Sequence, residues 1–523
     1  MPPVDEVEAA EVPRAARISA AATLLAASVL LSRLLGYARE ALLAYRVGAG
    51  AATDAYYAAF QIPDLLNYLL AGGALSIAFL PLYTKRLAAG DEAGADHLLA
   101  TVLGTLTAVA AVATALIWWF AEPLIALQFP RFDPAARAMT VHLTRIVLPA
   151  QVLFIAGGIV NATLFAHGRF GAAALAPLLY NGGIIAGGLL LAPRMSAGVE
   201  GFAWGALVGS VAGPFLAPLL YARGRVRLRA RVAPFDRVFL GYLLIAAPLM
   251  LGQSLLTVDE WYQRWFGALL GTGAVSHLSY ARRLMQVPVA VVGQAIAAAA
   301  LPTLSRLFAE GKRSELNRTV LRTLQTGLAL AVLAAAGCYA LAHPLVHAVY
   351  QRGAFGPADT IEVADILALL CFAVPAWITQ QIIVRAFYAR ADTWRPMLLG
   401  TGVALASIPL YLALGRSGGV RGLATASAIG MSVSAAATLI WARWRHGAPA
   451  LRRLFDSGCR AAVIALPAAA LVRWLFGAPT DSMSAALGHL AAGIGLFAAL
   501  VGVGIAVIGD EPTRALLRRL RRG

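Results

Sequence analysis

The stretch SRLLGYARE, residues 32–40, lies inside the first long apolar segment of the chain and carries the charged side chains of Arg33, Arg39 and Glu40. A charged group in the hydrocarbon of a bilayer costs at least a few kcal/mol unless water or a partner meets it. Charges of this kind usually face the interior of a helix bundle or a water-filled path. The stretch therefore predicts a membrane span with a functional polar face.

The composition of the whole chain agrees with a membrane protein. Of the 523 residues, 60% are hydrophobic and 13% are charged, whereas roughly half of an ordinary soluble protein is apolar. Apolar runs of about 20 residues recur from residue 17 to residue 507, including 397–414 and 423–441, and each can cross a core of about 30 Å as a helix. No segment alternates with a period of two, which excludes a transmembrane β-barrel. We predict an all-α integral membrane protein with about fourteen transmembrane helices.

Basic residues are concentrated in alternate joints between the predicted spans. The most basic joint runs from Arg223 to Arg237 and a second basic run from Arg514 to Arg522, whereas the opposite joints hold mostly single arginines. Because positive loops stay in the cytoplasm, this asymmetry places both termini there. The net charge of +17 lies next to span ends, so it indicates topology and contact with anionic lipids and does not favour nucleic-acid binding.

The chain matches itself with a shift of 221 residues. LPLYTKRLAAG at Leu80–Gly90 falls on LPTLSRLFAEG at Leu301–Gly311, and AEPLIALQF at Ala121–Phe129 falls on AHPLVHAVY at Ala342–Tyr350. Chance similarity of Ala- and Leu-rich helices is the alternative, but proline, glycine and basic positions rarely match together. We predict two pseudo-symmetric six-helix lobes followed by two extra C-terminal helices. Parallel repeats of this kind hold their substrate between the lobes, near the midplane of the membrane.

The repeat divides the chain into six predicted parts. They are a cytoplasmic tail at residues 1–16, a first lobe at residues 17–222, a basic cytoplasmic linker at residues 223–237, a second lobe at residues 238–445, the two extra helices at residues 446–509, and a basic cytoplasmic tail at residues 510–523.

Charged residues recur in both predicted lobes. Beyond the opening stretch they include Asp54, Asp259, Glu260, Arg264, Arg282 and Arg283, and the polar Asn67 accompanies them. Arginine stays charged when it is buried, because its pKa is too high for it to lose its proton. Its planar guanidinium can bind two phosphate oxygens at once. A cavity with several arginines therefore favours a phosphate or diphosphate. The alternative is that these charges only pair with one another, for example Arg39 with Asp54 and Arg283 with Glu260.

At these residues the sequence resembles the MurJ (MviN) lipid II flippases of the multidrug/oligosaccharidyl-lipid/polysaccharide (MOP) exporter superfamily. The longest similar stretch is SRLLGYAREALLAYRVGAGAATDAYYAAFQIPDLLNYLLAGGALSIAFLP, residues 32–81. Further similar blocks follow in the family's order over nearly the whole chain, namely GRFGAAALAPLLYN at residues 168–181, SYARRLMQVP at 279–288, YQRGAFG at 350–356 and RAFYARADTWRP at 385–396.

The resemblance implies two six-helix lobes around a cationic cavity, with a groove for a polyprenyl tail along the last two helices, residues 446–509. It also implies that Arg33, Arg39 and Arg283 contact the diphosphate. Glu40 and Asp54 would belong to the gate of the cavity, with Ser32 nearby. We add Arg282 and Asn67 to the substrate-binding candidates, and Glu260 to the gate.

Three positions depart from the family's pattern. The family often has arginine where this chain has Asn67, an acidic residue where it has Gly72, and aspartate where it has Arg282. The positive charge is therefore moved toward the second lobe. Some members of the family bind sodium between the seventh, eleventh and twelfth helices, but MLLGTGVALASIPLYLAL at residues 397–414, the eleventh predicted span, holds no Asn or Asp, so we predict no metal site.

The predicted function is that of a flippase, not an enzyme, which moves lipid II across the bacterial cytoplasmic (inner) membrane by alternating access. We predict no cofactor, and a cycle driven by the membrane potential or a coupled ion. The expected partners are lipid II, membrane lipids and cell-wall synthesis proteins. Two alternatives stay open: a flippase for another polyprenyl-diphosphate glycan, such as an O-antigen or capsule unit, and a membrane enzyme acting on such glycans. The glycan, the coupling ion, the resting conformation and the oligomeric state are left open by the sequence.

Overall fold

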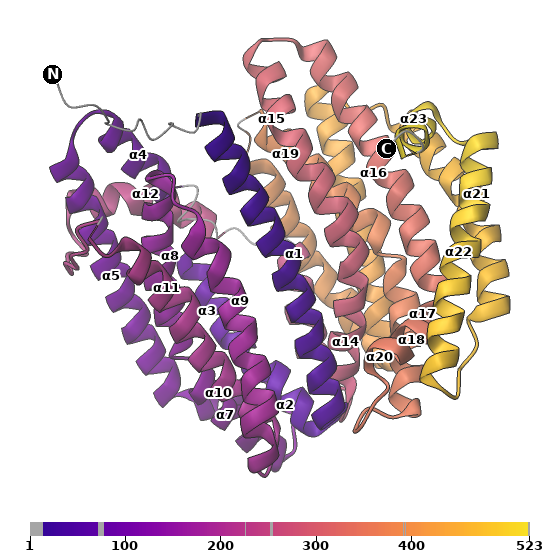
Figure 1. Ribbon diagram of the computed structural model, residues 1–523, viewed down its shortest axis with the longest axis horizontal. Coiled ribbons are helices and arrows are strands. Elements are labelled where there is room, and N and C mark those ends of the chain that lie inside the picture. The colour runs from indigo at the N-terminus through magenta and orange to yellow at the C-terminus, as the bar shows by residue number, and fades with distance from the viewer. Residues whose placement is uncertain are drawn as a thin grey trace, which may run out of the picture. The chain divides into compact units, whose positions relative to one another are not determined.

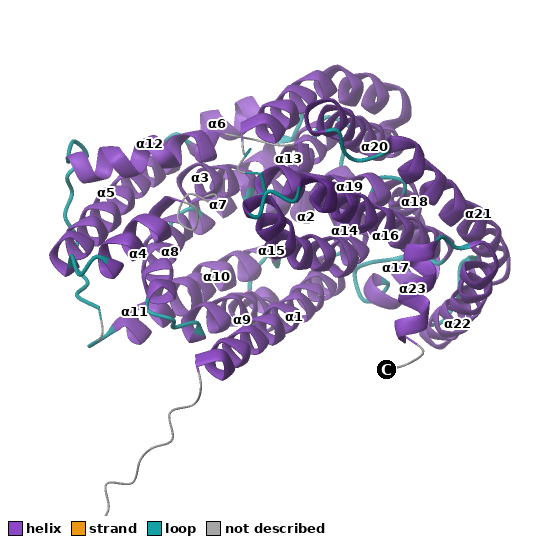
Figure 2. Cartoon of the chain, turned by 90° about the horizontal axis from the view of Figure 1, so that it is seen from above, coloured by secondary structure: helices purple, strands orange, loops and turns teal. Residues whose placement is uncertain are grey.

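The computed structural model describes residues 14–71, 78–224, 226–251, 255–390, 392 and 394–520, and all regular structure in these ranges is helical (Figure 2). The predicted all-α membrane class is confirmed. Gly72, one of the departures from the family's pattern, lies outside the described residues. The helices group into two compact units. Unit 1 comprises the described residues of Met1–Glu40, Ile62–Trp119 and Thr144–Met250, and unit 2 those of Ala41–Gln61, Phe120–Leu143 and Leu251–Gly523.

Unit 1 holds most of the N-terminal helices. They are α1 (Arg14–Val47), which ends in unit 2, α3 (Gln61–Ala71), α4 (Leu80–Ala88), α5 (Glu92–Trp119), the end of α7 (Pro134–Val147), α8 (Ala150–Ala166), α9 (Gly171–Ala186), η2 (Gly187–Leu191), η3 (Ala192–Arg194), α10 (Val199–Ser210), η4 (Val211–Leu216), α11 (Ala217–Ala222) and α12 (Arg237–Leu251).

Unit 2 holds two short N-terminal helices and the C-terminal helices. They are α2 (Ala51–Ala59), α6 (Ala121–Gln128), the start of α7, α13 (Leu255–Gly267), α14 (Ala274–Pro288), η5 (Val289–Gln294), α15 (Ala295–Ala309), α16 (Arg313–Ala340), α17 (Ala342–Tyr350), α18 (Pro357–Cys371), α19 (Val374–Tyr388), α20 (Trp394–His446), α21 (Leu451–Phe476), α22 (Met483–Ile508) and α23 (Glu511–Leu520).

Among the described residues, nine helical segments are long and apolar enough to cross a membrane, and a tenth joins them if α18 and α19, bent by 45°, form one span. The longest, α20, contains Gly419 at φ 58° and ψ −138°, so two helices meet there, at the joint between the predicted spans 397–414 and 423–441. Other predicted spans consist of short helices such as α2, α3 and α13. The multi-span fold is therefore confirmed, but the number of fourteen is not.

The 221-residue repeat of the sequence recurs in the helix boundaries. α5 and α16 are both 28 residues long and occupy Glu92–Trp119 and Arg313–Ala340. The next helices, α6 and α17, begin at Ala121 and Ala342. Both pairs keep the predicted shift, so the duplication extends from residue matches to helix lengths. The borders of the predicted lobes stay a prediction, since α12 groups with unit 1 by its contacts.

Within unit 1, glycines bring α9 and α10 close together. A Cβ atom at Gly205 would lie 2.5 Å from the carbonyl oxygen of Gly183, and one at Gly183 would lie 2.5 Å from the Cα atom of Gly209. Small residues spaced four apart let helices approach closely in hydrocarbon, where water does not drive them together. These glycines are therefore packing residues.

The predicted linker at residues 223–237 lies along α5, also within unit 1. The backbone N–H of Arg231 donates to the carbonyl oxygen of Ala100 at 2.9 Å. Val226 and Leu228 pack against the apolar core of the unit, while Arg227 and Arg229 between and beyond them are exposed. Alternating side chains in an extended segment point to opposite sides. This part of the linker thus exposes Arg227 and Arg229 to the solvent and packs Val226 and Leu228 against the core of the unit.

In unit 2, α16, α21 and α22 lie side by side (Figure 1). Their shared core contains Leu333 and Ala336 of α16, Ala465 and Ala469 of α21, and Ile505 of α22. Alanines facing leucine and isoleucine let the helices pack closely. This contact attaches the two extra C-terminal helices to the rest of unit 2.

Candidate functional site

Four predicted site residues lie on α1, in unit 1. Ser32, Arg33 and Arg39 are half-buried and Glu40 is buried. The Arg39 Nη2 atom lies 2.6 Å from Glu40 Oε1, and its Nη1 atom donates to Asn181 Oδ1 at 3.2 Å. The side chain of Arg39 is 18% exposed and that of Glu40 is 3% exposed. The guanidinium is therefore largely buried and has a carboxylate and an amide among its partners.

Asn181 of α9 was not among the predicted site residues. Its amide nitrogen donates to Ser32 Oγ at 3.2 Å, while its amide oxygen accepts from Arg39. A carboxamide has both donor and acceptor, so one side chain can orient both groups of α1. One feature of the sequence could have identified it: Asn181 is an asparagine in an otherwise apolar span, at the end of the block GRFGAAALAPLLYN.

Asn67 of α3 also has a partner in unit 1. Its amide nitrogen donates to Oε1 of the buried Gln151 on α8 at 2.9 Å. This bond joins α3 to α8 and leaves the Asn67 side chain half-buried. Its predicted role in substrate binding stays a prediction.

Asp54 of α2 caps α14 within unit 2. Its carboxylate is 2% exposed and accepts hydrogen bonds from the backbone N–H groups of Gly273, at 2.6 Å, and Ser276, at 2.7 Å. The first N–H groups of a helix have no intrahelical partner, and the helix dipole favours an anion there. The residue predicted to belong to the gate therefore also holds the helix that carries Arg283.

A second charged cluster joins α13 and α14 in unit 2. Asp259, which is 0% exposed, accepts from Arg282 and from the Tyr411 hydroxyl of α20. Glu260 accepts from Arg264 one turn further along α13. Arg282, proposed from the sequence as a substrate ligand, thus lies in a buried ion pair.

Arg283, the next residue of α14, is half-buried. The residues on either side of it, Arg282 and Leu284, are buried. Arg283 therefore has the more accessible guanidinium of the two, and its predicted contact with a diphosphate stays a prediction.

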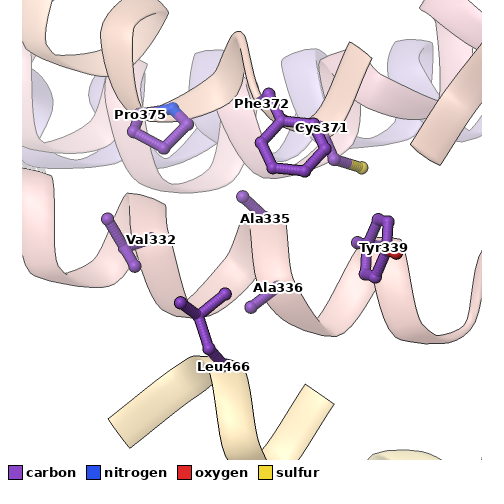
Figure 3. Close-up of a pocket in the computed structure, with 8 residues that line it drawn as sticks. All are labelled: Val332, Ala335, Ala336, Tyr339, Cys371, Phe372, Pro375 and Leu466. Carbon is purple, nitrogen blue, oxygen red and sulfur yellow. The ribbon is translucent and has the colours of Figure 1, made fainter. Parts of the chain in front are cut away.

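Two apolar cavities lie along α21 in unit 2. The first, of about 120 Å³, is lined by α16 residues including Tyr339, by Phe372 and Pro375 at the bend between α18 and α19, and by Leu466 of α21 (Figure 3). The second, of about 350 Å³, also borders Pro375 and reaches Phe455 of α21. Both present hydrocarbon walls with almost no polar atoms, which suits an acyl or prenyl chain.

Among the described residues, no group of three or more His, Cys, Asp or Glu side chains could hold a metal ion. The polar cluster of unit 1 contains the guanidinium of Arg39 and the amide of Asn181, which are donors suited to an anion.

Proteins with similar sequences are described as lipid II flippases. Residues 43–484 match the family described as Lipid II flippase MurJ. A probable lipid II flippase MurJ of Rhizobium meliloti (strain 1021) is 30% identical over 525 residues, covering 95% of each chain. A lipid II flippase MurJ of Burkholderia cenocepacia is 30% identical over 392 residues, covering 72% of this chain and 74% of the relative.

Solved structures share the fold. A lipid II flippase MurJ in an inward closed conformation superposes with a TM-score of 0.77 at 21% identity, covering 92% of this chain and 99% of that one. An inward-facing MATE family multidrug resistance transporter of the MOP superfamily gives 0.69 at 17% identity, covering 82% and 98%. At these identities the structures show the fold alone, whereas the match over residues 43–484 and the 30% relatives show membership. The chain belongs to the lipid II flippase MurJ family.

Proposed function

We propose that this protein moves lipid II, the undecaprenyl-diphosphate glycopeptide used to build peptidoglycan, from the cytoplasmic to the outer leaflet of the bacterial inner membrane. The observation that carries the proposal is the Arg39 guanidinium, which a helix of a membrane protein holds between Glu40 and Asn181. Family membership supports the choice of substrate, and this geometry supports the place at which its diphosphate binds.

The diphosphate takes the place of Glu40 on Arg39. A carboxylate and a phosphate present similar anionic oxygens, and the arginine fork binds either of them with two parallel hydrogen bonds. Glu40 keeps Arg39 neutralised until substrate arrives, which is the gate role expected for it. Asn181 holds Arg39 and Ser32 in position meanwhile.

Arg33 and Arg283 are the further candidate ligands of a diphosphate. Arg33 lies six residues before Arg39 on α1, about 9 Å along the helix axis and about a third of a turn around it. Arg283 of α14 is proposed as a separate contact for a diphosphate, in unit 2. The prenyl tail stays in hydrocarbon, along the apolar cavities that border α21.

The cycle is that of a transporter and not of an enzyme. With both termini in the cytoplasm, a membrane potential that is negative inside favours outward movement of the anionic head and inward return of the empty cationic site. The energy available is about 2.3 kcal/mol per elementary charge for each 100 mV if a charge crosses completely. We propose that the membrane potential or a coupled ion drives the cycle without ATP.

Complementation of a strain depleted of its own lipid II flippase tests the proposal. We expect the parent protein to restore growth and prevent lipid II accumulation, Arg39→Lys to restore them weakly because it keeps charge but loses the fork, and Arg39→Ala to fail. Protein levels in the membrane serve as the control. Normal lipid II transport by Arg39→Ala would remove Arg39 from the site.

The same test addresses the alternative substrate. If the parent protein is present in the membrane but does not restore growth, and instead restores export of an O-antigen or capsule unit in a strain lacking that flippase, the substrate is another polyprenyl-diphosphate glycan. The arginines would keep their role, because all these lipids share the diphosphate.

A further inference from the structure

Arg282 lies on the buried face of α14, and Arg283 lies beside that face. Leu278, Ala281 and Met285 form a buried stripe at positions i, i+3 and i+7, and Arg282 takes position i+4 of the same stripe. Arg282 is 4% exposed. Arg283 is half-buried and points about 100° further around the helix.

Arg282 contacts side chains of two other helices, and a third helix holds its partner Asp259. Its Nη1 atom donates to Asp259 of α13, and its guanidinium lies 4.8 Å from the ring centroid of Trp377 on α19. Asp259 is held in turn by the Tyr411 hydroxyl of α20 and by Gln263 Nε2 at 3.1 Å. Asp259 and Tyr411 are both 0% exposed. A buried, multiply bonded ion pair of this kind defines one orientation of the helices that carry it.

The charges of this cluster cancel. Glu260 Oε2 lies 3.9 Å from Arg282 Nε, and Glu260 also accepts from Arg264. Among these contacts, two carboxylates meet two guanidinium groups, so the charge of Arg282 is balanced by that of Asp259. If Arg282 turned toward a diphosphate, it would leave Asp259 as a buried charge without its counterion, which is strongly unfavourable.

We propose that Arg282 is a positioning residue and not a substrate ligand: its pair with Asp259 sets the rotation of α14 and thereby presents Arg283 to the diphosphate. The inference rests on the proposed function for its substrate, but its structural half does not need that substrate. It reassigns Arg282, which the sequence placed among the ligands.

A charge swap separates positioning from binding. Asp259→Asn and Arg282→Gln each break the pair, and we expect each to lower lipid II transport by about tenfold or more. The double variant Asp259→Arg with Arg282→Asp restores an ion pair of opposite direction but loses the bonds from Tyr411 and Gln263 to position 259, so we expect it to recover part of the transport that each single variant loses. A ligand role predicts the opposite, because the double variant puts a carboxylate where the ligand stood.

A second readout does not depend on lipid II. The assay uses a protein in which Cys338, Cys371 and Cys459 are replaced by alanine and Arg283 by cysteine. The rate at which a water-soluble thiol reagent labels the new cysteine measures how accessible position 283 is. We expect Asp259→Asn to change this rate by about fivefold or more and the charge swap to return it toward the parent's rate. The milder Tyr411→Phe removes only one hydrogen bond to Asp259 and should change the rate in the same direction by less.

The two readouts distinguish the possible failures. Thermal unfolding in detergent first establishes that each variant is folded. If folded Asp259→Asn and Tyr411→Phe proteins label like the parent, the positioning role is wrong. If labelling follows the swap but the parent itself does not transport lipid II, Arg282 positions Arg283 as inferred and the proposed function is wrong.

Discussion

The Asp54 carboxylate of α2 lies 2.7 Å from the backbone nitrogen of Ser276 in α14, although the two residues are 222 positions apart. With its second bond, to the N–H of Gly273, Asp54 closes the amino-terminal end of the helix that carries Arg282 and Arg283. One buried carboxylate therefore connects a short helix of the first repeat to a basic helix of the second.

Replacing Asp54 should destabilise the protein. Asp54→Ala leaves two buried N–H groups of α14 without an acceptor and removes a favourable charge from the positive end of its dipole, so we expect a loss of about 2 kcal/mol. Asp54→Asn keeps an acceptor and should lose less. Thermal unfolding of the purified protein in detergent measures both.

Asp133 offers a matched control in the same unit. It caps α7 with two bonds of 2.9 Å, to the backbone nitrogens of Ala135 and Ala136, but it is exposed to solvent. Water can replace an exposed cap, so Asp133→Ala should lose less than Asp54→Ala. Equal losses would show that burial of the Asp54 bonds contributes nothing.

Asn181→Leu should reduce transport while leaving the fold intact. The substitution keeps the volume of the side chain but removes the acceptor for Arg39 and the donor to Ser32, so Arg39 loses its position while its charge stays. We expect a drop of about tenfold, the usual effect of removing a residue that orients a charged ligand. Complementation and precursor accumulation measure it.

Asn161 of α8 is the control for this prediction. Its Oδ1 atom is buried and has no hydrogen-bond partner, so Asn161→Leu removes an unsatisfied acceptor and should leave transport near normal. An equal defect from both substitutions would mean that polar residues in these spans matter for assembly and not for Arg39.

Adding a single methyl group at Gly205 should separate α9 from α10. The new Cβ of Gly205→Ala would lie 2.5 Å from the Gly183 oxygen, where backbone must move, so we expect a loss of about 1–3 kcal/mol. Gly182→Ala on α9 is the control, since no atom lies within 4 Å of its added Cβ. Thermal unfolding separates the two, and a tolerant Gly205→Ala would contradict the close approach.

The linker on α5 should loosen at low pH. The N–H of Val238, followed by the His97 side chain, holds the pKa of Asp236 below its ordinary value of 3.8. Because the folded form has the lower pKa, this stabilisation is complete above pH 3.8 and is lost as the pH falls through the folded value.

Asp236→Asn imitates the protonated carboxyl at neutral pH. We expect faster hydrogen exchange at Arg231 and Ala233, whose N–H groups donate to α5. Below the folded pKa of Asp236 the parent and the variant should exchange alike. A difference that persists there would assign the effect to something other than the charge.

Most of the fold could be predicted from the local composition of the sequence and from its internal repeat. Apolar runs predicted the helical membrane class, and the 221-residue shift reappears in the bounds of α5 and α16. The joint at Gly419 was predicted, since it lies between the predicted spans 397–414 and 423–441. The count of spans was harder to predict, because some predicted spans consist of short helices such as α2 and α3, and because packing decides whether α18 and α19, bent by 45°, form one span.

The sequence predicted which residues carry the charges of the candidate site, but not which groups those residues contact. Arg39 and Glu40 were both predicted site residues, but the partner considered for Arg39 was Asp54, whereas Arg39 pairs with Glu40, its neighbour on the same helix. Arg282 was grouped with Arg283 because both are arginines, yet its partner Asp259 makes it part of a buried ion pair. Spacing on α14 alone would have placed Arg282 on the buried stripe.

The sequence by itself determined the membrane class, the duplication and the presence of arginines in apolar spans, because hydrophobicity, repeat register and charge are properties of the residues wherever they fold. Only the tertiary structure decided which group each charge meets: Asn181 for Arg39, Asp259 for Arg282, and the end of α14 for Asp54. Hydrogen bonds and ion pairs act over a few ångströms. Which groups come within that distance depends on how distant helices pack, and the sequence around each residue does not show this packing.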